Sequence, residues 1–265
     1  MPIDHDDPVL ILLPPSEGKS VPARGPALDL AALSLPGLTS ARRAVLAALA
    51  DMCSCDPQRA RTVLGLSPRQ APEVAWNAGL DRAPTAPAAE VYTGVLFQAL
   101  GHRDLDRAAR RRLDDQVLVW SGLWGAVRLD DPIPAYRLSA SVDLPGIGRL
   151  PAFWRPHLGA ALAALVADQV VLDLRSSAHA SSWRGPPAAT VVGRVLHERA
   201  GTLAVASHFN KATKGRLVRA LAQQGRDPAT PEELVESVRA AGFVAAWAPG
   251  SGRRPATLDI VVTDP

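Results

Sequence analysis

Short runs of apolar residues, separated by longer amphipathic stretches, limit the folds open to this chain. The runs have the length of buried strands and lie at 9–13, 117–120, 170–174, 190–192, 203–206 and 258–262. Between them, apolar residues recur at helical spacing over 41–51, 156–167, 213–224 and 231–241. The runs 191–195 and 203–206 are close enough in sequence to form a hairpin. The alternation therefore predicts an α/β fold in which helices flank a mixed β-sheet.

Length and composition indicate one globular domain. The chain has 265 residues, 47% of them hydrophobic, without an internal repeat, so we expect a single domain spanning 1–265. The net charge of +3 permits a polyanionic partner without requiring one. The acidic start lacks the order of a signal peptide, and no apolar run approaches the roughly 20 residues of a membrane span. We therefore expect a cytoplasmic monomer that does not bind membranes.

Cysteines and histidines form no pattern typical of a disulfide framework or a metal site. Cys53 and Cys55 are too close in sequence to bridge well, and the chain has no other cysteine. The six histidines are scattered and include no H-E-x-x-H motif. The sequence therefore predicts neither a metal nor a cofactor.

The loop after the first strand carries a lysine suited to an anion. Gly18-Lys19-Ser20 matches the end of a Walker A loop, but Leu13 stands where that motif begins with glycine. The prolines that follow also prevent the helix that completes such a site. We expect a loop of another type that presents Lys19 to an anion.

A basic segment at 207–216 opens the third amphipathic stretch. Lys211, Lys214 and Arg216 fall in its first turns, where each positive charge opposes the helix dipole at a cost of about 0.3 kcal/mol or more. No acidic residue occurs between Gly201 and Arg226. This placement favours an anion site over a solvated basic face, with His208 and Asn210 beside it.

Two further segments place polar side chains just beyond expected strands. Residues 120–128 enter a glycine-rich turn that ends in Arg128, and Tyr136 and Arg137 follow. Arg175 and Ser176 come directly after the run at 170–174. Open α/β sheets bind ligands beyond their strand ends, so all five are candidate contacts, although the tryptophans of 120–128 fit a core edge equally well.

The serines near His179 do not indicate a hydrolase. The chain has no G-x-S-x-G elbow, and Ser177 and His179 are too close in sequence for the usual catalytic pair. No catalytic residue is therefore assigned.

Two glycine turns are candidates for a helix–hairpin–helix, in which backbone amides contact DNA phosphates. The turn at 64–67 has the better flanks, with helical stretches expected at 57–63 and 68–76. The turn at 144–148 has more typical letters, but the residues before it alternate like a strand. We expect the motif at 64–67 only.

Taken together, these segments resemble the YaaA family of peroxide stress proteins. The matching pieces occur in the family's order at 15–19, 91–94, 121–128, 135–138, 153–154, 172–177 and 207–216. The resemblance implies a single α/β fold of the family's own type, a positively charged cleft and a helix–hairpin–helix. It also implies binding of duplex DNA by structure more than by sequence, and a role in peroxide stress. The early motif and the loop around Arg175 depart from better-known members, and 242–265 has no match.

The leading hypothesis is a DNA-binding protein of the oxidative stress response. Its candidate DNA- or phosphate-binding residues are Lys19, Arg128, Tyr136, Arg137, Arg175, Ser176, His208, Asn210, Lys211, Lys214 and Arg216. The alternative is an enzyme acting on a phosphorylated or nucleotide-like small molecule in the same cleft, with His208 or Tyr136 as proton carrier. A broad open groove would favour DNA, whereas a deep pocket around Lys19, Arg128 and Lys211 would favour the enzyme.

Overall fold

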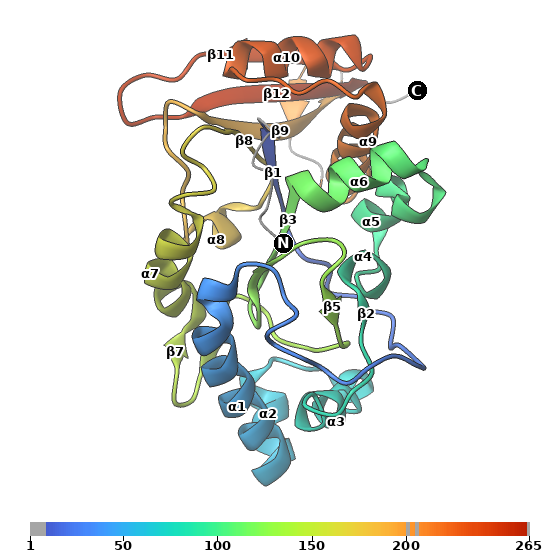
Figure 1. Cartoon of the computed structure of the whole chain (residues 1–265), viewed down its shortest axis with the longest axis vertical. Coiled ribbons are helices and arrows are strands. Elements are labelled where there is room, and N and C mark those ends of the chain that lie inside the picture. The colour runs from blue at the N-terminus through green and yellow to red at the C-terminus, as the bar shows by residue number, and fades with distance from the viewer. Residues whose placement is uncertain (1–8, 200–201, 205–206, 264–265) are drawn as a thin grey trace.

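A mixed β-sheet forms the centre of the protein in a computed structural model that describes residues 9–199, 202–204 and 207–263 (Figure 1). The strand order is β11-β12-β9-β8-β1-β3-β4, and β10 pairs with β9 outside this path. These strands are β1 (Val9–Leu13), β3 (Val117–Ser121), β4 (Gly125–Val127), β8 (Val170–Asp173), β9 (Thr190–Arg199), β10 (Thr202–Ala204), β11 (Val244–Ala248) and β12 (Ala256–Thr263). The predicted mixed α/β fold is confirmed.

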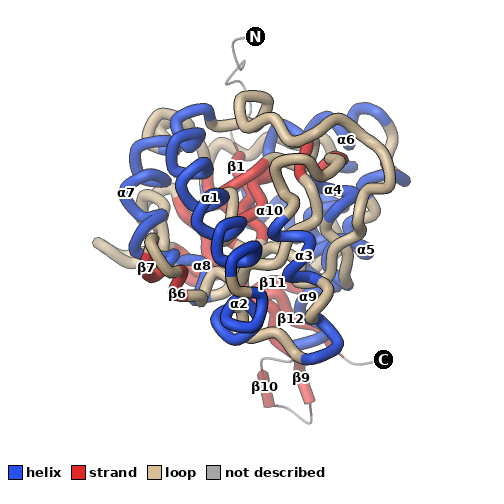
Figure 2. Tube along the Cα trace, turned by 90° about the horizontal axis from the view of Figure 1, so that it is seen from below, coloured by secondary structure: helices blue, strands red, loops and turns tan. Residues whose placement is uncertain are grey.

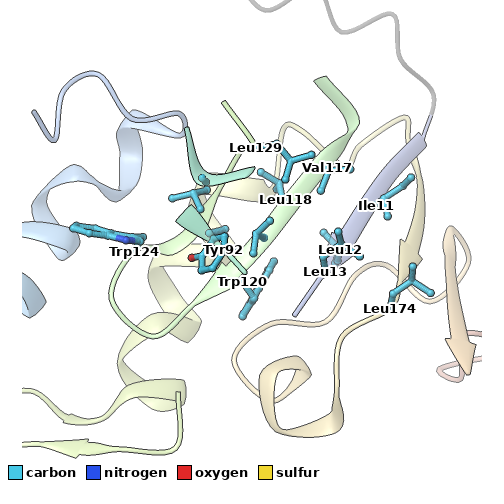
Figure 3. Close-up of a cluster of buried hydrophobic side chains, with 14 of the residues drawn as sticks. Ile11, Leu12, Leu13, Tyr92, Val117, Leu118, Trp120, Trp124, Leu129 and Leu174 are labelled. Carbon is cyan, nitrogen blue, oxygen red and sulfur yellow. The ribbon is translucent and has the colours of Figure 1, made fainter. Parts of the chain in front are cut away.

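The middle of the sheet is parallel and its outer strands are antiparallel. Ile11 on β1 lies opposite Val117 on β3 and Leu172 on β8, and β9 continues parallel to both β8 and β12. The strands β4, β10 and β11 run antiparallel to their neighbours, so the predicted hairpin between β9 and β10 is also confirmed. All five residues of β1 are apolar and buried, as a central parallel strand with two covered faces requires. Figure 3 shows Ile11, Leu12 and Leu13 of this strand among the buried side chains.

Ten helices of the described chain surround this sheet (Figure 2). They are α1 (Thr39–Cys55), α2 (Pro57–Val63), α3 (Glu73–Ala78), α4 (Ala88–Val91), α5 (Val95–Leu100), α6 (Arg107–Gln116), α7 (Leu150–Leu162), α8 (Ser177–Ala180), α9 (Ser207–Gln224) and α10 (Pro231–Ala240). Helices α1 to α3 gather at one end of the molecule, and α10 lies with β11 and β12 at the other (Figure 1). Within the described residues, no helix has both the length and the apolar character of a membrane span.

Two helices begin ahead of the apolar periodicity that predicts them. Helix α7 starts at Leu150 rather than at Pro156, because Pro151 occupies its first turn and Pro156 lies inside the helix. A proline in the first turn costs no hydrogen bond, whereas an internal proline removes one. Helix α9 starts at Ser207, ahead of the periodic stretch 213–224, so the basic segment 207–216 opens the helix as expected.

Short elements complete the fold. They are the 3₁₀ turns Pro36–Leu38, Pro68–Gln70 and His102–Asp104, and the strand pairs β2 (Ala86–Pro87) with β5 (Pro132–Ile133) and β6 (Asp143–Leu144) with β7 (Gly148–Arg149). The turn at 144–148 therefore connects the two short strands β6 and β7, and no helix precedes it, as expected. Residues 136–142, which alternate like a strand in sequence, form no strand. The helix expected over 68–76 is divided into a 3₁₀ turn and α3.

Candidate functional site

A cleft of about 910 Å³ opens beyond the carboxyl ends of β1 and β8. These strands are parallel neighbours, so their carboxyl ends share one edge of the sheet, where folds of this class bind ligands. The lining comes from the loop 14–19 after β1, the turn at 64–65, the start of α5 (93–97), the segment 136–141, residues 176 and 179 at α8, and residues 210, 211 and 214 of α9. Six distant parts of the chain thus meet at one site.

Backbone pairing fixes the loop after β1 in this cleft. The Ser20 N–H donates to Val91 O over 2.8 Å, and the Thr93 N–H donates to Gly18 O over 3.1 Å. Gly94 has φ +124°, and a Cβ there would lie 2.7 Å from Ser16 Oγ. Glycine is favoured here because other residues rarely adopt this positive φ and because a Cβ would crowd the Ser16 side chain. The two segments hold Lys19 at the cleft between them.

Lys19 is a lysine with an unusually acidic ammonium group. Its Nζ donates to Ser16 O over 2.8 Å and lies 4.4 Å from the ring centre of Tyr136. Burial, and then the positive charge of Arg137, lower the pKa of Lys19 to about 7, against a partial opposing effect of Glu17 and Glu73. At neutral pH the amine is therefore divided between its charged and uncharged forms.

Tyr136 is buried beneath Lys19 and belongs to a chain of three hydroxyls. Its Oη lies 2.7 Å from Ser121 Oγ and 2.8 Å from Tyr92 Oη. Ser121 Oγ already accepts the N–H groups of Leu123 and Trp124, so its own proton goes to Tyr136. Either phenol can be the donor in the bond between Tyr136 and Tyr92. Burial raises the pKa of Tyr136 to about 12, which keeps the phenol neutral.

Arg137 lines the cleft but is already engaged by two carboxylates. Its guanidinium lies 3.3 Å from an oxygen of Glu17 and 3.3 Å from an oxygen of Glu73. The Arg137 backbone exchanges two hydrogen bonds with the buried side chain of Asn77, which fixes its position. Arg137 therefore brings less free positive charge to a ligand than the sequence predicts.

The first turns of α9 place three predicted residues in the cleft. Lys211 is exposed, Lys214 donates to Leu174 O over 2.7 Å, and Asn210 has a buried Oδ1 without a partner among the described atoms. Burial lowers the pKa of Lys214. The expectation for His208 concerns a side chain outside the described part of the structure.

Close packing of α9 on α5 sets this position. Gly215 faces α5, and a Cβ there would lie 2.2 Å from Leu96 O. The glycine next to Lys214 thus has a packing role.

Ser176 lies in the cleft as predicted, together with His179, which the sequence analysis did not select. Ser176 Oγ lies 2.8 Å from His179 Nδ1. Burial and the positive charge of Arg175 lower the pKa of His179 to about 4, so its imidazole is neutral at pH 7. The tautomer of the imidazole decides which of the two groups donates in this bond. The spacing of three residues on a helical turn was the available signal, because it puts Ser176 and not Ser177 beside the histidine.

Three predicted cations do not line the cleft. The buried Arg175 is paired with both oxygens of Asp173 and lies 3.9 Å from the ring centre of Trp120. Arg128 donates to backbone carbonyls of Asp114 and Asp115, and Arg216 donates to Thr213 on its own helix. Arg175 and Arg128 are buried and make these contacts inside the protein.

The turn at 64–67 forms part of the rim, but its amides are already bonded. Gly65 takes the left-handed conformation at φ +64° and, with Leu66, donates back to carbonyls of α2. The Ser67 N–H donates to Gln70 Oε1 over 3.2 Å. A phosphate at this turn would therefore have to displace an existing hydrogen bond.

No cluster of three metal-binding side chains occurs among the described residues.

All the lysines of the protein lie in this cleft. The sequence contains 26 arginines but only three lysines, Lys19, Lys211 and Lys214. All three contribute to the lining, whereas the arginines are spread over the molecule. The cleft is therefore chemically distinct from the rest of the surface.

Comparison with known proteins identifies the family. Residues 9–246 match the family described as peroxide stress protein YaaA. A UPF0246 protein of Streptomyces coelicolor is 52% identical over 258 residues, covering 96% of this chain and 98% of the relative. A UPF0246 protein of Corynebacterium efficiens is 41% identical over 259 residues, covering 96% of this chain and all of the relative. The similarity reaches beyond the last matching motif at 207–216, and the chain belongs to the peroxide stress protein YaaA family.

Proposed function

We propose that the protein acts in the peroxide stress response as a cytoplasmic monomer that binds duplex or distorted DNA with little sequence specificity. The observation that carries this proposal is the placement of all three lysines, Lys19, Lys211 and Lys214, in one cleft. Lysine ammonium groups contact phosphates as point charges and carry no sequence information. Together with Arg137 they outnumber the carboxylates of Glu17 and Glu73, which gives the cleft a positive balance.

The size of the cleft supports DNA that is locally distorted. A volume of about 910 Å³ lies within the range of sites for small ligands and is too small for the width of a duplex. A nucleotide displaced from the stack fits such a volume, and displacement costs least where pairing is already disturbed. We therefore propose that one unstacked nucleotide enters the cleft while the flanking duplex lies on the rim.

Helix α2 and the 3₁₀ turn Pro68–Gln70 that follows it offer further contacts for the flanking duplex. Arg59, Arg61 and Arg69 are exposed along α2 and the 3₁₀ turn that follows it, next to the rim residues Leu64 and Gly65. Because the amides of the turn are bonded internally, side chains rather than backbone would supply the phosphate contacts here. The helix–hairpin–helix expected at 64–67 stays a prediction, since a 3₁₀ turn and α3 follow the turn in place of a single helix.

The second candidate is an enzyme that acts on a phosphorylated or nucleotide-like small molecule in the same cleft. The observation in its favour is the environment of Lys19, whose partial deprotonation at neutral pH suits acid–base or nucleophilic chemistry. A free nucleotide and an unstacked nucleotide present the same groups to the cleft, so the two candidates differ in the source of the ligand.

Binding titrations over a range of salt concentrations test the proposal. Fluorescence anisotropy would compare a linear duplex with the same duplex carrying a single-nucleotide bulge. Two or three lysine–phosphate contacts predict a slope of log K against log salt of about −2 to −3, and tighter binding of the bulge. Lys211→Ala is expected to reduce the slope by about 1.

Arg43→Ala, at an exposed position of α1 outside the cleft, is the matched control and should leave the slope unchanged. Absence of duplex binding at low salt would overturn the DNA proposal. The melting temperature would also be measured with and without a nucleoside monophosphate. A large increase on addition of this ligand, without duplex binding, would favour the enzyme.

A further inference from the structure

The use of lysine in the cleft is difficult to explain by charge alone. Apart from these three lysines, the basic side chains that carry a permanent positive charge are 26 arginines, Arg137 of the same cleft among them. Arginine keeps its proton under all ordinary conditions and binds phosphate well, whereas a lysine amine can lose its proton and act as a nucleophile. A chain that keeps lysine only at one cleft therefore points to amine chemistry there.

Lys19 is the lysine best placed for such chemistry. Arg137 lies beside it and opposes its charge, whereas Lys214 has the carboxylate of Asp173 nearby and Lys211 is exposed. In its hydrogen bonds with Ser16 O and Glu17 O, Lys19 Nζ is the donor. These contacts leave the lone pair of the neutral amine unused. Burial beside another cation is a known way to activate a lysine toward carbonyl compounds.

We propose that Lys19 forms a Schiff base with an aldehyde that also carries a phosphate, while Lys211 and Lys214 hold the phosphate. This inference rests on the proposed function, because it assigns the ligand class of the same cleft. Two sources offer that chemistry: the ring-opened deoxyribose of an abasic site in distorted DNA, and a free sugar phosphate.

The step balances without a further reactant. The lone pair of Lys19 Nζ attacks the carbonyl carbon and forms a C–N bond, while the carbonyl π electrons move to oxygen. One of the two protons of the amine then moves from nitrogen to that oxygen. The resulting carbinolamine loses its hydroxyl group as water, taking a proton that the nitrogen gives up. An aldehyde and an amine thus yield an imine and one water molecule.

Reductive trapping tests the proposal directly. Sodium borohydride reduces an imine to a stable secondary amine, so the protein would be incubated with an abasic-site duplex or with ribose 5-phosphate, reduced and mapped by mass spectrometry. We expect an adduct on Lys19 with at least one of these probes. The probe that is trapped identifies the source of the aldehyde.

Two variants separate the amine from the positive charge. Lys19→Arg keeps the charge and cannot form an imine, so trapping should disappear while binding of a tetrahydrofuran abasic-analogue duplex, which has no aldehyde, falls far less. Arg43→Lys adds an exposed lysine on α1, outside the cleft, and the new residue should gain no adduct.

Several results would overturn the inference. These are an adduct confined to other amines, an adduct that persists in Lys19→Arg, and no adduct although the analogue duplex binds. Failure of the proposed function looks different: the analogue duplex does not bind at all. If ribose 5-phosphate were then trapped on Lys19 without any duplex binding, the Schiff-base proposal would stand. DNA would be rejected as the source of the aldehyde.

Discussion

Lys19 couples the stability of the fold to pH. Burial and the charge of Arg137 lower its pKa from 10.5 to about 7, so between these values the unfolded chain binds more protons than the folded one. The free energy of unfolding therefore rises with pH across this window, by at most about 1.4 kcal/mol per pH unit from this group. Below pH 7 both states are protonated and the contribution is constant.

Lys19→Met removes this contribution. Urea denaturation between pH 6 and 10 should show the wild-type protein gaining stability relative to the variant above pH 7, with a constant difference below it. Arg43→Met, which removes a permanently charged and exposed side chain, should give a curve parallel to the wild type. Parallel curves for Lys19→Met as well would show that the amine titrates at its ordinary pKa in the folded protein.

The sequence could indicate which loops reach the cleft, but not which side chains are free to bind. Lys19 and Ser176 follow parallel neighbouring strands and meet as predicted, because strand ends at one sheet edge are close in space. Arg175 follows the same strand as Ser176 but turns inward onto Trp120 and Asp173. A choice between solvent and an aromatic face depends on partners that are set only when the chain folds.

The sequence also could not predict which arginines outside the candidate site are buried. Arg42 is fully buried in α1 and donates to the carbonyls of Ser34, Trp124 and Ala126. Those bonds satisfy backbone carbonyls, two of them near the turn that follows β3. Nothing local in the sequence distinguishes Arg42 from its exposed neighbour Arg43.

At the scale of elements, the packing of α9 on α5 positions the lysines of α9. Gly215→Ala would place a methyl group 2.2 Å from Leu96 O and force the helices apart. We expect a loss of about 1–3 kcal/mol in the free energy of unfolding, as for other overpacked contacts, together with weaker binding of bulged duplex. Urea denaturation and the anisotropy titration measure the two effects.

A second helical glycine provides the control. Gly159 in α7 has no neighbouring atom within 4 Å of its virtual Cβ, so Gly159→Ala should stabilise the protein by up to about 1 kcal/mol. Equal effects of the two substitutions would mean that α9 can move away from α5 at no cost.

Elements with a strong local pattern were predictable, and elements defined by their partners were not. The apolar run of β1 and the capped start of α10, where the Thr230 side chain accepts from the Glu233 N–H, carry their own signals. Strand β11 (Val244–Ala248) was missed, because three of its five residues are alanine and its identity as a strand comes from pairing with β12. Tertiary pairing overrides weak β propensity in such a segment.

At the scale of the whole molecule, the distribution of lysines allows chemical labelling of amines to measure whether a ligand occupies the cleft. Every lysine lies there, so an amine-specific reagent applied at pH 7.5 should modify the folded protein only in the cleft and at the amino terminus. We expect Lys211 to react through its exposure and Lys19 through its uncharged fraction.

A ligand that fills the cleft should protect all three lysines together. Mass spectrometry would count the labels with and without bulged duplex, and the added amine of an Arg43→Lys variant, at an exposed position outside the cleft lining, serves as the internal standard. The proposed function requires loss of the lysine labels with that standard unchanged. Bound duplex that leaves the labels in place would locate DNA on another surface, whereas protection by a nucleoside monophosphate alone would assign the cleft to a small molecule. The positions of three residues in one cleft thus allow a single labelling experiment to decide between the two functions.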